Sequence, residues 1–245
     1  MNRFVKMALV PTACALALAA QAQTQTDNQW HGGISLGGAF ASGNSSSRTL
    51  SASADGVKAT TADKITLYSL ANYGRSKVNG VNTTTANLLR AGGRYDYNLS
   101  DRTFVFGGAE GETNKAGGVK SRYSLNGGMG FKLVRSNTAS LDLFGGVGYS
   151  STTFTDASKR KGAELLLGEE GSYKLSETTT VKQRLVVYPG ESDVGTRATL
   201  DASLATAISG GWTLNTGLGV RYAGKVPAGQ KKTDSLVTVG FGFKY

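Results

Sequence analysis

The sequence holds a single histidine, His31, and a single cysteine, Cys14, and these limit the chemistry available to the chain. His31 could act as a general base beside a serine and an acid, as in membrane acyl hydrolases. One cysteine and one histidine are too few for a four-ligand zinc site or a disulfide framework. We therefore expect no enzymatic activity, no metal and no cofactor, and we interpret His31 as a structural residue.

Two glycine clusters have the composition of phosphate-binding loops, namely Gly127-Gly128-Met129-Gly130 and Gly145-Gly146-Val147-Gly148. A nucleotide-binding loop leads into a helix, whose N-terminus holds the phosphate. Neither cluster precedes a helical pattern. Glycine also supplies 34 of the 245 residues, about twice the usual share of roughly 7%. Such clusters are therefore expected by chance.

Charged side chains are more informative, because many of them alternate with apolar residues along the chain. In a strand this pattern gathers the charges on one face. If that face lined a barrel lumen, the two-to-one excess of basic over acidic residues on it would favour anions. A lumen filled by salt bridges would give the same pattern and is the simpler interpretation. The lumen candidates are Arg90, Arg94, Lys120, Arg122, Glu164, Glu170, Arg184, Asp201 and Arg221.

The elements that would carry these residues are long alternating segments. Several of them reach 12–16 residues, whereas an ordinary strand has about 5–6 and a strand crossing a bilayer at ~45° needs about 9–11. We predict twelve strands, at residues 30–42, 47–58, 64–76, 84–97, 102–112, 119–134, 139–151, 162–175, 179–188, 195–208, 211–223 and 234–245.

The connections between these segments alternate in length. Those after even-numbered segments are short, as at 98–101 and 209–210, whereas those at 77–83, 152–161 and 224–233 are longer and more polar. This is the plan of an outer-membrane barrel. A spanning sheet must also close, because each unpaired backbone group in lipid costs several kcal/mol. We predict an all-β fold, a closed antiparallel transmembrane β-barrel of about 12 strands with up-and-down topology; a soluble β-sandwich is the alternative.

The alternation also predicts which face each side chain occupies. Glu110 and Glu112 share the parity of two phenylalanines expected outside, so we expect a bulge at Gly107-Gly108 to turn them inward. Glu169 shares the parity of lipid-facing leucines, and the sequence offers no reason for it. The expected lipid-facing residues are Ile34, Leu36, Phe40, Leu165, Leu167, Leu185, Val187 and alternate residues from Trp212 to Tyr222. The expected aromatic girdle is Tyr95, Tyr97, Phe104, Phe106, Tyr173, Trp212 and Tyr245.

The N-terminus has the features of a cleaved secretory signal peptide over residues 1–22. Arg3 and Lys6 precede an apolar stretch, which ends in the small-x-small pattern Ala20-Gln21-Ala22. Its removal would leave a cysteine-free barrel domain at residues 23–245 with a net charge of +8. These features predict the outer membrane of a Gram-negative cell as the location. Dispersed positive charge without a binding motif argues against nucleic acid as a partner.

Two further features concern partners in the envelope. Lysine and arginine suit phosphate groups, and basic residues in two long connections could contact lipopolysaccharide or could equally be a solvated surface. The C-terminal residues Phe241, Phe243 and Tyr245 alternate like the signal read by the outer-membrane assembly machinery. The basic residues of the expected outer rim are Lys159, Arg160, Lys161, Lys231 and Lys232.

Several segments form a recognisable series when they are taken in order. They are Trp30-His31-Gly32-Gly33-Ile34-Ser35-Leu36-Gly37, Ser42-Gly43-Asn44-Ser45, Arg94-Tyr95-Asp96-Tyr97-Asn98-Leu99-Ser100, Gly146-Val147-Gly148-Tyr149, Gly168-Glu169-Glu170-Gly171-Ser172-Tyr173-Lys174-Leu175-Ser176, Tyr188-Pro189 and Lys232-Thr233-Asp234-Ser235. Together they resemble the YdiY-like family of salt-induced outer-membrane proteins, whose biochemistry is unassigned. The resemblance implies an outer-membrane barrel and a link to salt stress, and it supplies no catalytic residues. We therefore expect a small passive anion-favouring channel or a salt-stress envelope protein; the alternative is a sealed structural barrel that contacts lipopolysaccharide.

Overall fold

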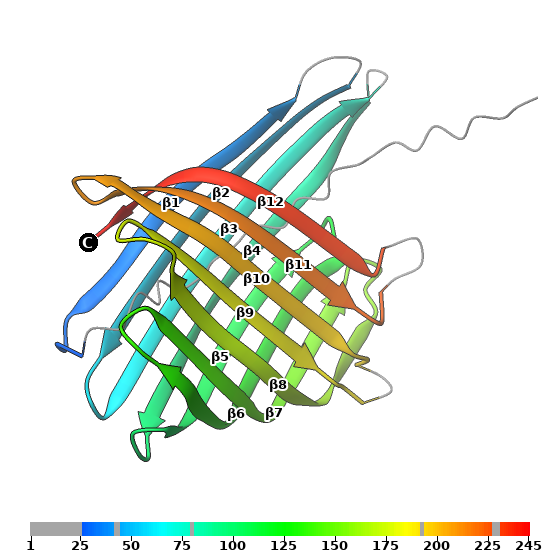
Figure 1. The fold of residues 1–245 in the computed structure, drawn as a ribbon. Helices are drawn as coiled ribbons and strands as arrows, with labels where there is room; N and C mark the ends of the chain where they lie inside the picture. The colour runs from blue at the N-terminus through cyan, green and yellow to red at the C-terminus, as the bar shows by residue number, and fades with distance from the viewer. Residues whose placement is uncertain (1–25, 42–44, 79–80, 192–193, 227–230) are drawn as a thin grey trace, which may run out of the picture.

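The structure, a computed structural model, describes residues 26–41, 45–78, 81–191, 194–226 and 231–245. Twelve antiparallel strands close into one barrel (Figure 1), which confirms the predicted fold. The predicted signal peptide, residues 1–22, and Pro227 lie outside the described residues. The strands are β1 (Trp30–Ala41), β2 (Ser45–Ala59), β3 (Asp63–Val78), β4 (Val81–Asn98), β5 (Thr103–Asn114), β6 (Val119–Arg135), β7 (Ala139–Phe154), β8 (Lys159–Lys174), β9 (Thr179–Tyr188), β10 (Arg197–Ser209), β11 (Trp212–Ala223) and β12 (Thr233–Lys244).

Each strand pairs with the next in sequence, and β12 returns to pair with β1. Several strands continue into residues predicted as loops, since Lys77 pairs with Asn82 and Thr152 pairs with Arg160. The β7–β8 connection is therefore a tight turn, in which the Ser158 N–H donates to Asp156 Oδ1 over 2.9 Å. No helix in the described part of the chain could span a membrane. We call the two ends of the barrel the short-turn rim and the long-loop rim.

The outer surface carries the predicted apolar band. Leu36 and Leu165 belong to this band, and 64% and 55% of their surfaces are exposed. Tyr95, Tyr97 and Trp212 are exposed near the short-turn rim, as are Tyr173 and Tyr245. An apolar band flanked by aromatic residues is the outer face of a transmembrane barrel.

Two predictions for β5 are wrong. Phe104 and Phe106 point into the barrel, with only 3% and 7% of their surface exposed, and they are not part of the girdle. No bulge occurs at Gly107-Gly108, because the pairing with β6 runs without a shift from Phe104 to Glu112. Phenylalanines and glutamates therefore share one inward face. Gly130 lies opposite Phe104, and its missing Cβ leaves the space that the ring occupies.

Glu169 lies on the outer face of β8, a position at which alternation offers no reason for a charge. The Gln183 Nε2 on β9 donates a 2.7 Å hydrogen bond to Glu169 Oε1. A cross-strand polar partner thus satisfies one of the two carboxylate oxygens within an otherwise apolar face.

The barrel interior contains two apolar clusters. The first, which we call the phenylalanine layer, consists of Phe104, Phe106, Phe144, Leu166 and Val186. The second, the leucine cluster, joins Leu70 of β3 and Leu88 of β4 to Leu236 of β12. Because these side chains occupy the lumen, the open space inside the barrel is divided into separate cavities.

Candidate functional site in the barrel lumen

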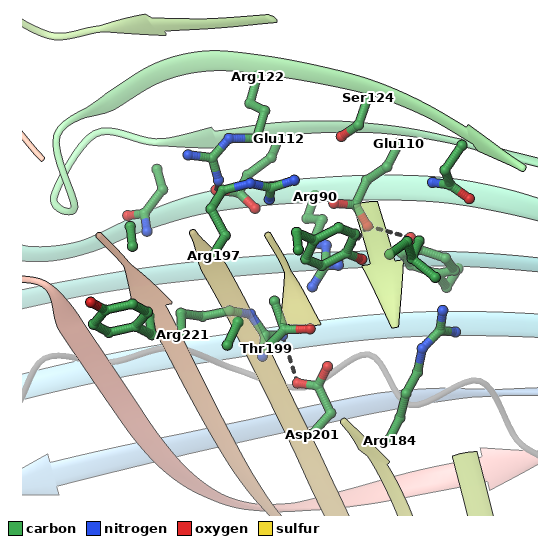
Figure 2. A pocket seen from close by; sticks show the side chains of 18 of the residues that line it. Arg90, Glu110, Glu112, Arg122, Ser124, Arg184, Arg197, Thr199, Asp201 and Arg221 are labelled. Atoms are coloured by element: carbon green, nitrogen blue, oxygen red, sulfur yellow. Dashed lines mark hydrogen bonds and ion pairs between the residues drawn. The ribbon is translucent and has the colours of Figure 1, made fainter. Parts of the chain in front are cut away.

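The lumen contains a charged cavity of about 1640 Å³, a volume that includes solvent at its mouth. We call it the central cavity (Figure 2). Strands β4–β6 supply one wall and β9–β12 another. Seven of the nine predicted lumen residues line it, namely Arg90, Arg94, Arg122, Glu170, Arg184, Asp201 and Arg221. Glu164 is buried nearby, while Lys120 is exposed at a bulge where β6 begins and does not line the cavity.

Ion pairs between strands neutralise most of these charges. Arg90 Nη2 lies 2.5 Å from Glu110 Oε2, which also accepts a hydrogen bond from the Tyr68 hydroxyl. Arg221 Nη2 lies 2.6 Å from Asp201 Oδ1. The other pairs that face the lumen are Arg122 with Glu112, Arg184 with Glu170, Arg197 with Glu164, Lys64 and Arg94 with Asp96, and Arg135 with Asp142.

Glu110 and Glu112 change the charge balance expected from the sequence. Both were expected to face inward through a bulge, and both line the central cavity without one, although the two-to-one count of inward charges did not include them. Arg197 approaches from the opposite wall and points toward Arg122 and Glu112 (Figure 2). Nine basic and five acidic residues line the cavity, which is thus a network of ion pairs with a basic excess.

The phenylalanine layer closes one route out of the central cavity. The Arg94 guanidinium carbon lies 4.3 Å from the ring centroid of Phe106 and 4.9 Å from that of Phe144. Its Nε donates to Asp96 Oδ1 over 2.5 Å, so its charge is both paired and covered by aromatic faces. Phe106 lines the central cavity, whereas Phe104 lines a separate cavity at the short-turn rim. The layer therefore stands between the two.

A second route runs along the opposite wall, where side chains are small. A cavity of about 830 Å³ follows β1, β2, β10, β11 and β12. We call it the seam cavity, because it lies where β1 meets β12. Its inward lining includes Gly33, Ser51, Ser53, Ser203 and Asn215, with Asp55 and Lys244 toward the short-turn rim.

Lys182 of β9 lines both the central and the seam cavity. Its side chain is buried, with 7% of the residue exposed. Among the described residues it has no hydrogen bond and no acidic oxygen within 4.0 Å, unlike the lumen arginines named above. Alternation alone puts Lys182 inside, but its lack of a partner depends on the three-dimensional arrangement and could not be predicted.

The basic residues of the long-loop rim fall into two groups. Lys231 and Lys232 are exposed and line the mouth of the central cavity. Lys159 and Lys161 are exposed on the outside, but Arg160 alternates inward, with its guanidinium carbon 5.2 Å from the Phe154 ring centroid. Because β8 begins at Lys159, the tripeptide is a strand with two faces rather than a loop.

The start of β1 and the end of β12 meet at the short-turn rim. His31 Nε2 lies 2.8 Å from Asp27 Oδ2, and the Gln29 backbone N–H that donates to Asp27 holds the pKa of this carboxyl below its ordinary value. Phe241, Phe243 and Tyr245 are exposed on the outside of the barrel, and Phe243 packs edge-on against Trp212. The described residues contain no cluster of His, Cys, Asp or Glu that could hold a metal ion.

Comparisons with known proteins agree with this architecture. The sequence profile of the family described as "Protein of unknown function, DUF481" matches residues 34–245. No curated protein matches the sequence. The COG4313 outer membrane channel from Pseudomonas putida F1 has a similar structure, with TM-score 0.53, 11% identity, and coverage of 88% of this chain and 95% of that one. The NanC porin gives TM-score 0.50 and 10% identity, covering 87% of this chain and all of that one.

Proposed function

We propose that this chain, which belongs to the DUF481 family, is a narrow anion-favouring channel of the outer membrane. The observation that carries the proposal is Lys182, a buried cation that lines both cavities and has no acidic oxygen of the described residues within 4.0 Å. In this proposal residues 1–22 are removed as a signal peptide, and the barrel is neither an enzyme nor a nucleic-acid-binding protein.

The route for a solute follows from the cavity linings. It enters past Lys231 and Lys232, crosses the central cavity, passes Lys182, and leaves along the seam cavity near Lys244. The phenylalanine layer fills the other side of the barrel, so Lys182 lies on the narrow part of the route.

The electrostatic argument rests on which charges are already compensated. An arginine in an ion pair exerts little net field on a passing ion, because the carboxylate of its partner lies within hydrogen-bond distance and the two charges largely cancel. Lys182 has no such close partner, because Asp55 and Glu170, the acidic residues that act on it, lie beyond 4.0 Å. More of its field therefore reaches a passing ion, and the low-dielectric wall strengthens that field. An anion crossing this point would gain a close partner, whereas a cation would be repelled.

The comparisons support the architecture of this proposal. Two of the similar structures are described as an outer membrane channel and a porin, although identities of 10–11% carry the fold alone. The selectivity comes from this chain's own residues.

The test is single-channel recording in planar lipid bilayers under a salt gradient. We expect the wild-type reversal potential to favour chloride over potassium, and Lys182→Glu to lower the permeability ratio by about tenfold, the scale of ~1.4 kcal/mol at one site. Lys161→Glu makes the same charge change on the outer surface and should leave the ratio nearly unchanged. Equal ratios in wild type and Lys182→Glu would contradict the role of Lys182.

A sealed structural barrel is the second candidate, and the density of lumen ion pairs favours it. In that case Lys159 and Lys161 would contact lipopolysaccharide phosphates, and the salt link implied by the YdiY-like resemblance would reflect an envelope role. A wild-type barrel that inserts into bilayers without measurable conductance would support this candidate over the channel.

A further inference from the structure

The closure between β1 and β12 is incomplete. The two strands pair over five positions, from Gly33 with Lys244 to Gly37 with Gly240. On its other side β1 pairs with β2 along its whole length, from Trp30 to Ala41. Among the described residues, 233–239 of β12 pair with β11 and have no partner on β1. The two strands diverge from this point toward the long-loop rim (Figure 1).

The unpaired stretch lies within the apolar outer band. Val237 and Val239 face outward there and are 63% and 51% exposed, beside Leu218 and Thr216 of β11. An unpaired backbone group in lipid costs several kcal/mol, so an open sheet edge at this depth must face water or line an opening. A wall that merely separated lipid from lumen would continue its pairing.

The lining of the seam cavity includes residues of both faces of the wall at this point. The cavity is lined by inward residues such as Ser51 and Asn215, and also by the outward residues Leu36 and Val239. The last pair before the opening is Gly37 with Gly240, where a Cβ on Gly37 would lie 2.8 Å from the Val239 carbonyl oxygen. The backbones thus touch at the base of the opening and separate above it.

An apolar surface continues from the opening into the lumen. Leu236 lies on the unpaired stretch of β12 and packs against Leu70 and Leu88. Leu70 lines the seam cavity and Leu88 lines the central cavity, beside Arg90. A molecule that follows this surface inward would bury a hydrocarbon chain and place its polar end among basic side chains.

We propose that the β1–β12 seam is a lateral portal through which the acyl chain of an anionic amphiphile passes between the surrounding leaflet and the lumen. The leucine cluster receives the chain, and the basic excess of the cavities receives a carboxylate or phosphate head. The proposal adds a lipid route to the aqueous route proposed above and depends on the same placement in the outer membrane.

Fluorescence quenching by lipid chains tests whether acyl chains reach the lumen. In a Cys14→Ala background, bimane is attached to Thr238→Cys beside the opening, to Ser124→Cys on the far lumen wall, and to Val147→Cys on the outside. In vesicles of phospholipids brominated on the acyl chains, bimane fluorescence at position 238 should be quenched to about half the extent seen at position 147. Bimane at position 124 should remain unquenched. Quenching at Thr238 no greater than at Ser124 would overturn the portal. Asn215→Cys serves as a second seam position if Thr238→Cys fails to assemble.

Cross-strand disulfides test the opening itself. Leu36→Cys with Phe241→Cys joins a paired position and should oxidise readily. Phe40→Cys with Val237→Cys would be opposite only if the pairing continued, and it should remain reduced under the same conditions. Equal cross-linking of both pairs would show a closed wall and overturn the proposal. Neither measurement requires ion flow, so a barrel without conductance is still tested.

Discussion

At the scale of single residues, the lumen is organised by partnerships that cross several strands. Tyr68, Arg90 and Glu110 form one such unit, in which Glu110 accepts from both of the others. About 13–14% of each of the two charged side chains is exposed, so water can replace a lost partner only in part. Removing one charge would leave the other buried and uncompensated.

We therefore expect Glu110→Ala to lower the free energy of unfolding by about 3 kcal/mol, the lower end of the range for breaking a buried pair. The double variant Arg90→Met/Glu110→Met should lose less than the single one, because no charge is left alone. The measurement is the urea midpoint of the heat-modifiable gel band in refolded barrel. Glu177→Ala, in an exposed turn, is the control and should leave the midpoint unchanged; a Glu110→Ala midpoint equal to that of Glu177→Ala would contradict the argument.

Alternation predicts on which side of the barrel wall most of these residues lie. It does not predict the residues with which they form ion pairs. Alternation placed Arg90, Glu164 and Asp201 inside without reference to any other strand. Arg197 of β10, however, pairs with Glu164 of β8 over the intervening chain, which continues past the end of β9 and bridges Glu164 at Gly190. A partnership of this kind depends on strand ends and register, which a pattern of period two does not contain.

At the scale of elements, twelve strands follow from alternation and turn chemistry, and their number and order are confirmed. The β5 error has a physical origin. Alternation divides the residues of a strand into two faces, but it does not show which face points into the barrel. Phe104 and Phe106 are expected on the lipid side because they are aromatic and apolar. Phe104 enters the lumen because the facing strand offers Gly130 and because Phe144 and Leu166 supply an apolar surface there.

Glycine pairs decide how closely neighbouring strands approach. A Cβ on Gly128 of β6 would collide with the backbone of Gly145 and Gly146 on β7, whereas a Cβ on Gly107 would meet nothing within 4 Å. We expect Gly128→Ala to destabilise the barrel by about 1–3 kcal/mol, the usual cost of overpacking, and Gly107→Ala to be neutral. The yield of folded, heat-modifiable barrel on refolding measures both. Equal yields would show that the strands can separate at no cost.

At the scale of the whole molecule, the phenylalanine layer limits the free cross-section of the lumen. Phe106 and Phe144 meet edge to face, with ring centroids 5.8 Å apart, and Arg94 lies over both. The layer joins β5, β7, β8 and β9, and Arg94 of β4 covers it, so one apolar cluster both braces the wall and occupies the pore.

Removing this layer should open a second aqueous path. We expect Phe106→Ala/Phe144→Ala to raise single-channel conductance by about twofold or more, because an apolar constriction excludes water and ions. Phe131→Ala removes an outward ring and is the control. Conductance that does not change in the double variant, while the barrel remains folded, would show that the layer does not restrict flow.

The seam between β1 and β12 also has a consequence for how the barrel forms. Every other pairing joins strands that are neighbours in sequence, while this one brings Gly32 to Tyr245, at opposite ends of the domain. The entropy lost on closing a loop grows with its length, and contacts between distant residues slow folding. The shortest ladder in the barrel therefore carries the largest entropic cost. Eleven hairpin pairings can form locally, and the rate of reaching the native state should depend on the few residues that join the first strand to the last.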